Sequence, residues 1–467
     1  MENTQKKGLT IGVQSFLTAL LVIFILMVAA YILTLIIPGG CYSRVPDQDG
    51  NLIIDTVSGF SYTEGGISFF RWLFSPILVL TAPGSGTIIA VTLFLLVIGG
   101  VFNALDKCGL MQYILNKTAC KFSAVRYKLM AVIALFFMAM GAMIGSFEEC
   151  VPLVPLVVAL SVNLGWDALT GIGMSLLAAG CGFASGVCNP FTVGVAQQLA
   201  GLPMFSGIWL RFLSFLVIYL LLILFLFHHA RKTTGSLGER TVIVPFTPSV
   251  QLERGMYAFA GILGLGIVLV FSAALIPALQ DYTMIIVAVM FLLAGIVSAV
   301  LSGVTAKTLC KTFCEGTASI FPAIIMILMA SSIKFTLEEA NVLDTILYGA
   351  VSIAKVLPGW SVILFLYLIV LIMNFFIPSG SAKAFMLIPL ILPLAQIFDI
   401  SPQLCILAFA FGDGFSNVLY PTNPALLIAL GLADVSYGKW FRWSIRFQLL
   451  NLVMTSLILL FGLLVGY

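Results

Sequence analysis

Charged residues are scarce in this sequence. Of its 467 residues only 9% are charged, with 22 Lys and Arg against 19 Asp and Glu, while 61% are hydrophobic. A soluble protein carries about a quarter of its residues as charges, so this chain cannot cover itself with a hydrated surface. The composition excludes a soluble globular protein and predicts an integral membrane protein.

Other absences narrow the class of function. The net charge is +3 and the basic residues are scattered, which argues against a nucleic-acid partner. Nine Cys occur without a Cys-x-x-Cys pair, and only Cys41 falls in a segment expected outside the membrane, so we expect neither a disulfide framework nor a metal site. His-Glu-x-x-His and P-loop motifs are missing too. We therefore expect no enzyme, no ATP-driven pump and no cofactor beyond Na⁺ or H⁺ as a coupling ion.

Long apolar runs predict most of the membrane spans, each needing about 20 residues. The first run, 11–37, is too long for a signal peptide and is interpreted as a retained span. The shorter piece 67–82 is expected at the membrane surface, because Arg71 lies near one end and Pro76 and Pro83 divide it. The predicted spans lie at 12–37, 86–106, 207–228, 254–276, 283–304, 312–333 and 443–465.

Four further apolar regions are interrupted. In 127–163 and 360–398 a polar, Gly/Ser-rich centre separates two arms of roughly 16 residues, which favours re-entrant hairpins. In 167–200 and 402–433, Gly and Asn-Pro sit in mid-span, which favours helices unwound near the bilayer centre. The fold class predicted is an all-α polytopic membrane protein, with about nine transmembrane helices and two re-entrant hairpins in inverted repeats.

The basic residues predict the orientation. With the N-terminus in the cytoplasm, 16 of the 22 Lys and Arg fall in cytoplasmic segments, as the positive-inside rule requires. This topology places the C-terminus outside.

The two halves of the chain resemble each other. The segment Gly207–Phe212 recurs at Gly438–Trp443, and the Asn-Pro that begins at Asn189 recurs at Asn423. These matches predict a first half at 1–235, a cytoplasmic linker at 236–253 and a second half at 254–467. Because the two hairpins open to opposite sides in the predicted topology, the repeats are inverted, as in secondary transporters with a site at the repeat interface.

Four charges do not lie at span ends: Glu148, Glu149, Lys383 and Asp413. Charge inside the membrane is costly and usually functional, and the repeat brings these groups toward one region. We expect the substrate to be bound by Ser146, Glu148, Glu149, Asn189, Thr192, Ser379, Ser381, Lys383, Asn417, Thr422 and Asn423. A coupling ion is expected at Asp413, Ser416, Ser146 and Asn189.

Structural alternatives stand beside these assignments. Asn189 and Asn423 are also typical helix caps, the two glutamates also suit a structural pair with Lys383, and Asp413 also suits a purely local role. The two Trp-x-Arg motifs are expected to anchor span ends at the lipid headgroups. The amphipathic pieces 108–121 and 336–356 are expected to be linker helices along the membrane surface.

With these features in place, the chain resembles the ion transporter superfamily, and specifically the YfcC-like and C4-dicarboxylate anaerobic carrier (DcuC-type) family of dicarboxylate carriers and basic amino-acid antiporters. The resemblance is carried by Gly145–Pro155, Ala184–Thr192, Pro378–Lys383 and Gly412–Pro424. Nine spans with two hairpins are also similar to the layout of p-aminobenzoyl-glutamate-type transporters. The resemblance implies a homodimer in the lipid of the bacterial inner membrane, in which a transport domain slides as an elevator against a fixed scaffold.

The chain departs from the Na⁺-coupled dicarboxylate relatives at both hairpin tips. The Ser-Asn-Thr signature of those relatives is replaced by Ser-Phe-Glu at 146–148 and by Ser-Gly-Ser at 379–381. The hypothesis is that the Lys383 ammonium takes the place of one coupling cation, which favours exchange. Glu148 or Glu149 would then face a substrate amine, which favours a small amino acid, basic ones included, over a dicarboxylate. The alternatives are a Na⁺- or H⁺-coupled symporter of C4-dicarboxylates or other small carboxylates and, more remotely, a channel.

Overall fold

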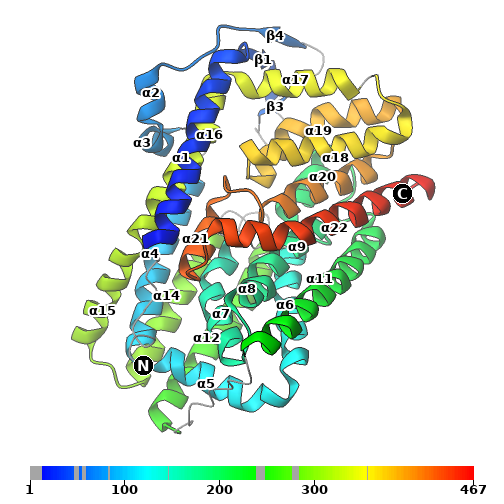
Figure 1. Cartoon of the computed structure of the whole chain (residues 1–467). Helices are drawn as coiled ribbons and strands as arrows, with labels where there is room; N and C mark the ends of the chain where they lie inside the picture. Colours follow the sequence, from blue (N-terminus) through cyan, green and yellow to red (C-terminus); the bar gives the residue numbers. More distant parts are fainter. Residues whose placement is uncertain are drawn as a thin grey trace.

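The described part of the chain is mostly helical in a computed structural model (Figure 1). Within the part of the chain that the structure describes, eight helices are long and apolar enough to cross a membrane. The protein is therefore a polytopic integral membrane protein. The structure describes residues 13–46, 52–54, 59–82, 85–145, 147–237, 248–275, 283–354 and 356–467.

A group of six helices is joined by mutual packing contacts, and its members α1, α4 and α15 lie on the left of Figure 1. Helix α4 packs against both α14 and α15, and α1 packs along α16. The backbones of α4 and α15 approach closely where Gly99 faces Gly316, since a Cβ on Gly316 would lie 2.2 Å from the Gly99 carbonyl oxygen. The six are α1 (Val13–Ile36), α4 (Ser85–Lys107), α12 (Val250–Leu275), α14 (Thr283–Leu301), α15 (Ala306–Ser319) and α16 (Phe321–Glu339).

The span expected at 312–333 is wrong in its bounds. Two helices cover this region: α15 begins at Ala306, and α16 continues to Glu339. They are separated at Ile320, and Pro322 lies in the first turn of α16, where a missing N–H has no helical acceptor to lose. The proline thus starts a new helix where hydropathy alone shows one continuous run.

The second group holds the hairpins and the interrupted helices. The first arms α6 and α18 pack along the interrupted helices α9 and α20, which in turn pack against each other. Three of the four arms are longer than expected, at 19, 18 and 18 residues for α6, α18 and α19. The group comprises α6 (Arg126–Ile144), η3 (Glu148–Leu153), α7 (Val154–Asn163), α8 (Ala168–Ile172), η4 (Gly173–Leu177), α9 (Ala178–Ser185), η5 (Pro190–Gly194), α10 (Val195–Leu199), α11 (Ile208–Leu237), α18 (Gly359–Phe376), α19 (Gly380–Ile397), α20 (Pro402–Ser416), α21 (Pro424–Leu432) and α22 (Tyr437–Leu464).

The interrupted helix of the first half is the most enclosed of the candidate spans. In the most apolar 18-residue stretch of each span, 94% of the residues are buried in Ala168–Leu199, against 44% in Arg126–Ile144 and in Gly359–Phe376. More than half of the residues in that stretch of each hairpin arm are thus at least partly accessible, while the interrupted helix lies inside the protein.

Short strands interrupt the all-α prediction in the polar loop after α1. Strand β1 (Gly40–Tyr42) pairs antiparallel with β4 (Phe60–Tyr62), and β2 (Arg44–Pro46) pairs antiparallel with β3 (Leu52–Ile54). The two pairs lie at the top of Figure 1 beside α17 (Val342–Ala354). There Asp344 accepts hydrogen bonds from the Tyr42 amide at 3.0 Å and from the Arg44 guanidinium at 2.9 Å.

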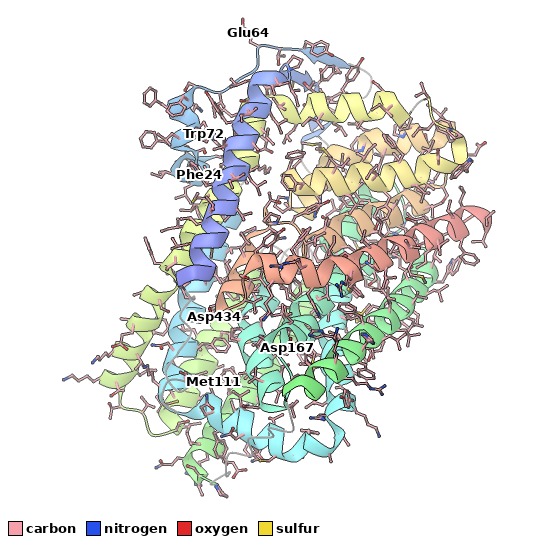
Figure 2. All side chains as sticks on the ribbon, viewed as in Figure 1. Phe24, Glu64, Trp72, Met111, Asp167 and Asp434 are labelled. Atoms are coloured by element: carbon pink, nitrogen blue, oxygen red, sulfur yellow. The ribbon has the colours of Figure 1, made fainter. Side chains whose placement is uncertain are left out.

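The piece 67–82 folds as α2 (Phe69–Leu73), α3 (Ser75–Leu78) and the 3₁₀ turn η1 (Val79–Thr81). These elements are too short to span a membrane. Trp72 donates an indole hydrogen bond of 3.1 Å to the Met27 carbonyl of α1, and Figure 2 shows this side chain lying beside that helix.

Helices α5 (Leu110–Phe122) and α17 cover most of the two pieces expected as linkers, but residues 336–339 of the second piece belong to α16. An ion pair from Lys117 to Glu253 ties α5 to α12. Between the halves, α11 ends at Leu237 and α12 begins at Val250; most of the predicted linker 236–253 lies outside the described residues.

Candidate functional site

Both hairpin tips contact one half-helix, η5 with α10, which begins after Asn189. Gly145, with φ of 76°, ends α6, and a Cβ on it would lie 2.4 Å from Asn189 Oδ1. A Cβ on Gly380, at the second tip, would lie 2.5 Å from Thr192 Cγ2. Asn189 and Thr192 are three residues apart, yet they contact two tips that are more than two hundred residues apart in the sequence.

The two interrupted helices touch at their breaks. A Cβ on Gly414 of α20 would lie 2.2 Å from Ala184 Cα of α9, and one on Gly180 would lie 2.4 Å from Val418 Cγ1. Only glycine permits backbones this close. The glycines in mid-span therefore serve contact between the two halves.

Both Asn-Pro dipeptides cap half-helices, as the structural alternative proposed. Asn189 Oδ1 accepts from the Phe191 amide at 3.0 Å, and Asn423 Oδ1 accepts from the Ala425 amide at 2.9 Å. Capping uses only the carbonyl oxygen of each side chain. Asn189 Nδ2 has no partner among the described residues, so this donor is free to meet a ligand.

Lys383 is completely buried and pairs with Asp413. Its Nζ donates to Asp413 Oδ1 at 2.5 Å and also to Asn374 Oδ1. The structural alternative, in which the two glutamates pair with Lys383, is therefore wrong. The ammonium of the second hairpin instead neutralises the carboxylate of the second interrupted helix.

Asn374 joins the hairpin to the end of α20. Its amide nitrogen donates to the Asp413 carbonyl at 3.0 Å, to Ser416 Oγ at 2.6 Å and to Asn417 Oδ1 at 3.0 Å. Sequence reasoning missed this residue. The available signal was a lone amide in the otherwise apolar end of α18, since a buried amide must find partners.

Glu148 and Glu149 lie in the first turn of η3 and are partly exposed. Glu148 is close enough to Asp413 for the two carboxylates to interact electrostatically. Neither glutamate takes part in an ion pair among the described residues. The first tip therefore holds two carboxyl groups for which the described part of the protein supplies no cationic partner.

Several polar atoms at the tips and breaks are buried without a hydrogen-bond partner among the described residues. They belong to residues from both halves and from both kinds of element, which is the pattern expected of groups that face a ligand. They are Asn189 Nδ2, Thr192 Oγ1, Glu149 Oε2, Asp413 Oδ2 and Thr422 Oγ1.

The remaining expected residues lie at the edge of this cluster. Ser379 is exposed and Ser381 half-buried at the start of α19, while Ser416 Oγ donates back to the Gly412 carbonyl at 2.9 Å. Asn417 Oδ1 also accepts from Asn423 Nδ2 at 3.1 Å. Ser146 lies outside the described residues. Groups of three or more His, Cys, Asp and Glu side chains suited to a metal ion are missing from the described part of the chain.

The headgroup-anchor interpretation of the Trp-x-Arg motifs is half wrong. Trp209 and Arg442 are exposed, but Arg211 and Trp440 are completely buried. Arg211 Nε donates to the Val187 carbonyl at 3.4 Å, and Trp440 Nε1 donates to the Val418 carbonyl at 2.8 Å. Each motif thus sends one side chain inward to a helix break.

Asp167 caps the start of α8 and is labelled in Figure 2. Its carboxylate accepts from the Thr170 amide at 2.9 Å and from His229 Nε2 of α11 at 3.0 Å. Burial raises the pKa of Asp167, but the hydrogen bonds from His229 and Thr170 outweigh burial and hold the pKa below its ordinary value. The pair fastens α11 to the interrupted helix.

Comparisons with known proteins match nearly the whole chain. The profile of the family described as C4-dicarboxylate anaerobic carrier matches residues 16–464. A relative from Escherichia coli K12, described as "Putative basic amino acid antiporter YfcC", is 30% identical over 82% of this chain and 79% of its own length.

Two solved transporter structures also match. The YdaH transporter of Alcanivorax borkumensis has 17% identity and a TM-score of 0.44, and the match covers 97% of this chain and 99% of that one. MtrF of Neisseria gonorrhoeae, from a class of antimetabolite efflux pumps, has 17% identity and a TM-score of 0.45, with coverage of 95% and 94%.

Proposed function

Since the chain belongs to the C4-dicarboxylate anaerobic carrier family, we propose that it is a secondary active antiporter that exchanges small, basic amino acids across the cytoplasmic membrane. Two acidic side chains without a cationic partner at the first hairpin tip carry this proposal. Lys383 neutralises Asp413, while Glu148 and Glu149 have no cationic partner among the described residues. A cationic substrate would balance them, whereas a dicarboxylate would be repelled.

The same cluster offers donors for the substrate's carboxylate. Asn189 Nδ2 is buried and unpartnered, and α19 begins at Gly380 without a side-chain cap, so its first amides are open. Helix N-termini favour anions. An amino acid can therefore place its carboxylate between the tips and its cationic groups toward the glutamates.

Lys383 supplies the basis for exchange. An ammonium fixed to the protein beside Asp413 neutralises that carboxylate as a bound cation would, but it cannot dissociate with the substrate. We expect the empty carrier to return poorly, because the site is electrostatically incomplete without its cargo. Obligatory exchange follows, with no need for a Na⁺ or H⁺ gradient.

The helices that connect the two groups support an elevator motion. Helices α5 and α17 link the group of six helices to the hairpin group, and each is tied to the six-helix side by an ion pair or by the short strands. We propose a homodimer whose six-helix group stays fixed, with the N-terminus in the cytoplasm and the C-terminus outside.

The name of the E. coli relative supports a basic amino acid, while the family description supports the alternative, a Na⁺- or H⁺-coupled symporter of C4-dicarboxylates. Counterflow into proteoliposomes separates them. Uptake of labelled arginine and of labelled succinate is measured in parallel into vesicles loaded with arginine, ornithine, neutral amino acids, succinate or short fatty acids, with and without Na⁺. Uptake of succinate but not of arginine contradicts the proposal.

Variants locate the site. Loss of one charge-assisted contact worth about 1.4 kcal/mol raises the KM about tenfold, so we expect that change for arginine in Glu148→Gln or Glu149→Gln. The matched control is Glu64→Gln, an exposed glutamate in the loop after α1, at the top of Figure 2. Unchanged kinetics in both tip variants would place the substrate elsewhere.

A further inference from the structure

Arg211 is a second cation enclosed in the hairpin group. Its side chain is completely buried near the start of α11, where an unpaired charge is costly. None of the ion pairs among the described residues includes it. Its polar neighbours include two backbone carbonyls, the Tyr467 hydroxyl and the Cys188 thiol.

The first of these carbonyls belongs to the helix break. Helix α9 ends at Ser185, Gly186 follows with φ of 52°, and the Val187 carbonyl accepts from Arg211 Nε at 3.4 Å. The C-terminal end of a helix carries partial negative charge. In carriers driven by Na⁺, unwound carbonyls and half-helix C-terminal ends of this kind are what coordinate the ion.

The second carbonyl is held in place by an unusual backbone. Phe205 has φ of 58°, an uncommon value for a non-glycine residue. Its amide donates to Gln197 Oε1 at 2.6 Å, and its carbonyl accepts from Arg211 Nη2 at 3.1 Å. Strain of this kind persists only where the surroundings enforce it, so the segment is shaped to receive the guanidinium.

The second break has a different arrangement. Val418 stands 231 positions after Val187, as Arg442 does after Arg211, but its carbonyl accepts from the neutral indole of Trp440. Arg442 is exposed. The cation of the second half comes instead from Lys383, which reaches the end of α20 through Asp413 and Asn374. Each break therefore has one cation built into the chain, from a different element in each half.

We propose that Arg211 is a positioning residue that substitutes for a coupling cation at the first helix break. It holds the Val187 carbonyl, and with it the Asn189 cap two residues later, in the geometry that receives substrate. With Lys383 at the other break, each of the two described breaks holds a cation that belongs to the chain itself. This inference rests on the exchange function proposed above and explains how exchange can proceed without Na⁺.

The test is rescue of Arg211→Ala by millimolar guanidinium, with neutral urea of the same shape as the control. Misplacing a positioned group costs about a hundredfold in rate, and we expect that loss of exchange in R211A, recovery with guanidinium and no recovery with urea. Arg211→Lys should retain exchange without added cation. Arg442→Ala, the repeat-related exposed arginine, should behave as the wild type.

A guanidinium gradient across the membrane distinguishes a coupling-cation site at Arg211 from a side chain that only packs. In R211A a guanidinium gradient should drive net accumulation of the amino acid, because the cation is now free to dissociate; in the wild type it should not. Equal effects of guanidinium and urea, or recovery of exchange without gradient-driven accumulation, would overturn the inference. If R211A does not fold, R211K carries the test, and exchange at background level in R211K would overturn it.

A second readout needs no substrate. The unfolding temperature of purified R211A should rise with guanidinium and not with urea, while that of the wild type stays constant. If wild-type protein exchanges no basic amino acid but R211A shows this selective shift, the proposed substrate fails while the cation site at the break stands. Absence of the shift in folded R211A contradicts the cation site itself.

Discussion

Lys383 Nζ lies 2.5 Å from Asp413 Oδ1, and both side chains are completely buried. The pair joins the first turn of α19 to α20 near its end, and so fixes the second hairpin tip against the second helix break. A buried ion pair stabilises little relative to an apolar pair, but removing one partner leaves an uncompensated charge. The role of this pair is therefore to fix the position of the second hairpin tip.

This asymmetry gives the first prediction. Lys383→Met or Asp413→Asn alone should destabilise the folded protein by about 3–5 kcal/mol, whereas the double variant should recover most of that loss. Thermal unfolding in detergent measures the stability, and counterflow measures transport. We expect the double variant to fold but not to exchange. Additive losses of stability in the double variant would show that the two side chains do not interact.

Asn374 gives the second prediction. Its amide serves Lys383 and three acceptors at the end of α20, so Asn374→Ala should cost about 1–3 kcal/mol of stability and lower the rate of exchange. The matched control is Asn103→Ala, which removes a buried hydrogen bond of 2.6 Å to the Thr312 carbonyl in the other helix group. That variant should lose stability but keep the exchange kinetics of the folded protein. Equal kinetic effects would mean that Asn374 has only a structural role.

The interruptions of the helices were predictable because their causes are local. Gly145, Gly186 and the two Asn-Pro dipeptides break a helix through their own backbone preferences, and the structure has breaks at each of them. The charged candidates were predictable for a similar reason, since a charge in an apolar run stands out whatever it contacts.

Partners across the fold were not predictable in the same way. That Lys383 meets Asp413 and not the glutamates depends on how α18, α19 and α20 pack, which no spacing within one segment reveals. Arg211 was misread because a Trp-x-Arg motif at a span end looks the same whether its arginine points to lipid headgroups or inward. The four strands of the loop after α1 are three residues long each, too short to leave an alternating pattern.

Asp167 gives a prediction on pH. Because its pKa is lowered in the folded protein, its ionised form stabilises the fold fully above the ordinary Asp pKa of about 4, and this contribution is lost as the pH falls through the lowered value. Asp167→Ala should therefore cost about 1 kcal/mol near neutral pH, and less below about pH 4. Unfolding temperatures across this range check the trend.

The partner of Asp167 supplies the control for that experiment. His229→Gln removes the contact of 3.0 Å to Asp167, while His228 is exposed next to it. We expect destabilisation from the first substitution and none from His228→Gln. A stability loss in Asp167→Ala that grows as the pH is lowered below about 4 would contradict the assigned direction of the pKa.

Gly380 gives the last prediction, because it lies where the second tip meets both halves. A methyl group there would lie 2.5 Å from Thr192 Cγ2 and 2.6 Å from Asp413 Oδ2, so Gly380→Ala must push the tip away from the half-helix that begins after Asn189. A displacement of about 1 Å at a positioned group costs roughly a hundredfold in rate, and we expect that loss of exchange in a protein that still folds. Gly349→Ala on α17, where a Cβ meets open space, is the control and should exchange normally. Adding Thr192→Ser to Gly380→Ala removes the clashing methyl group and should restore part of the rate, whereas no recovery would place the obstruction at Asp413 alone.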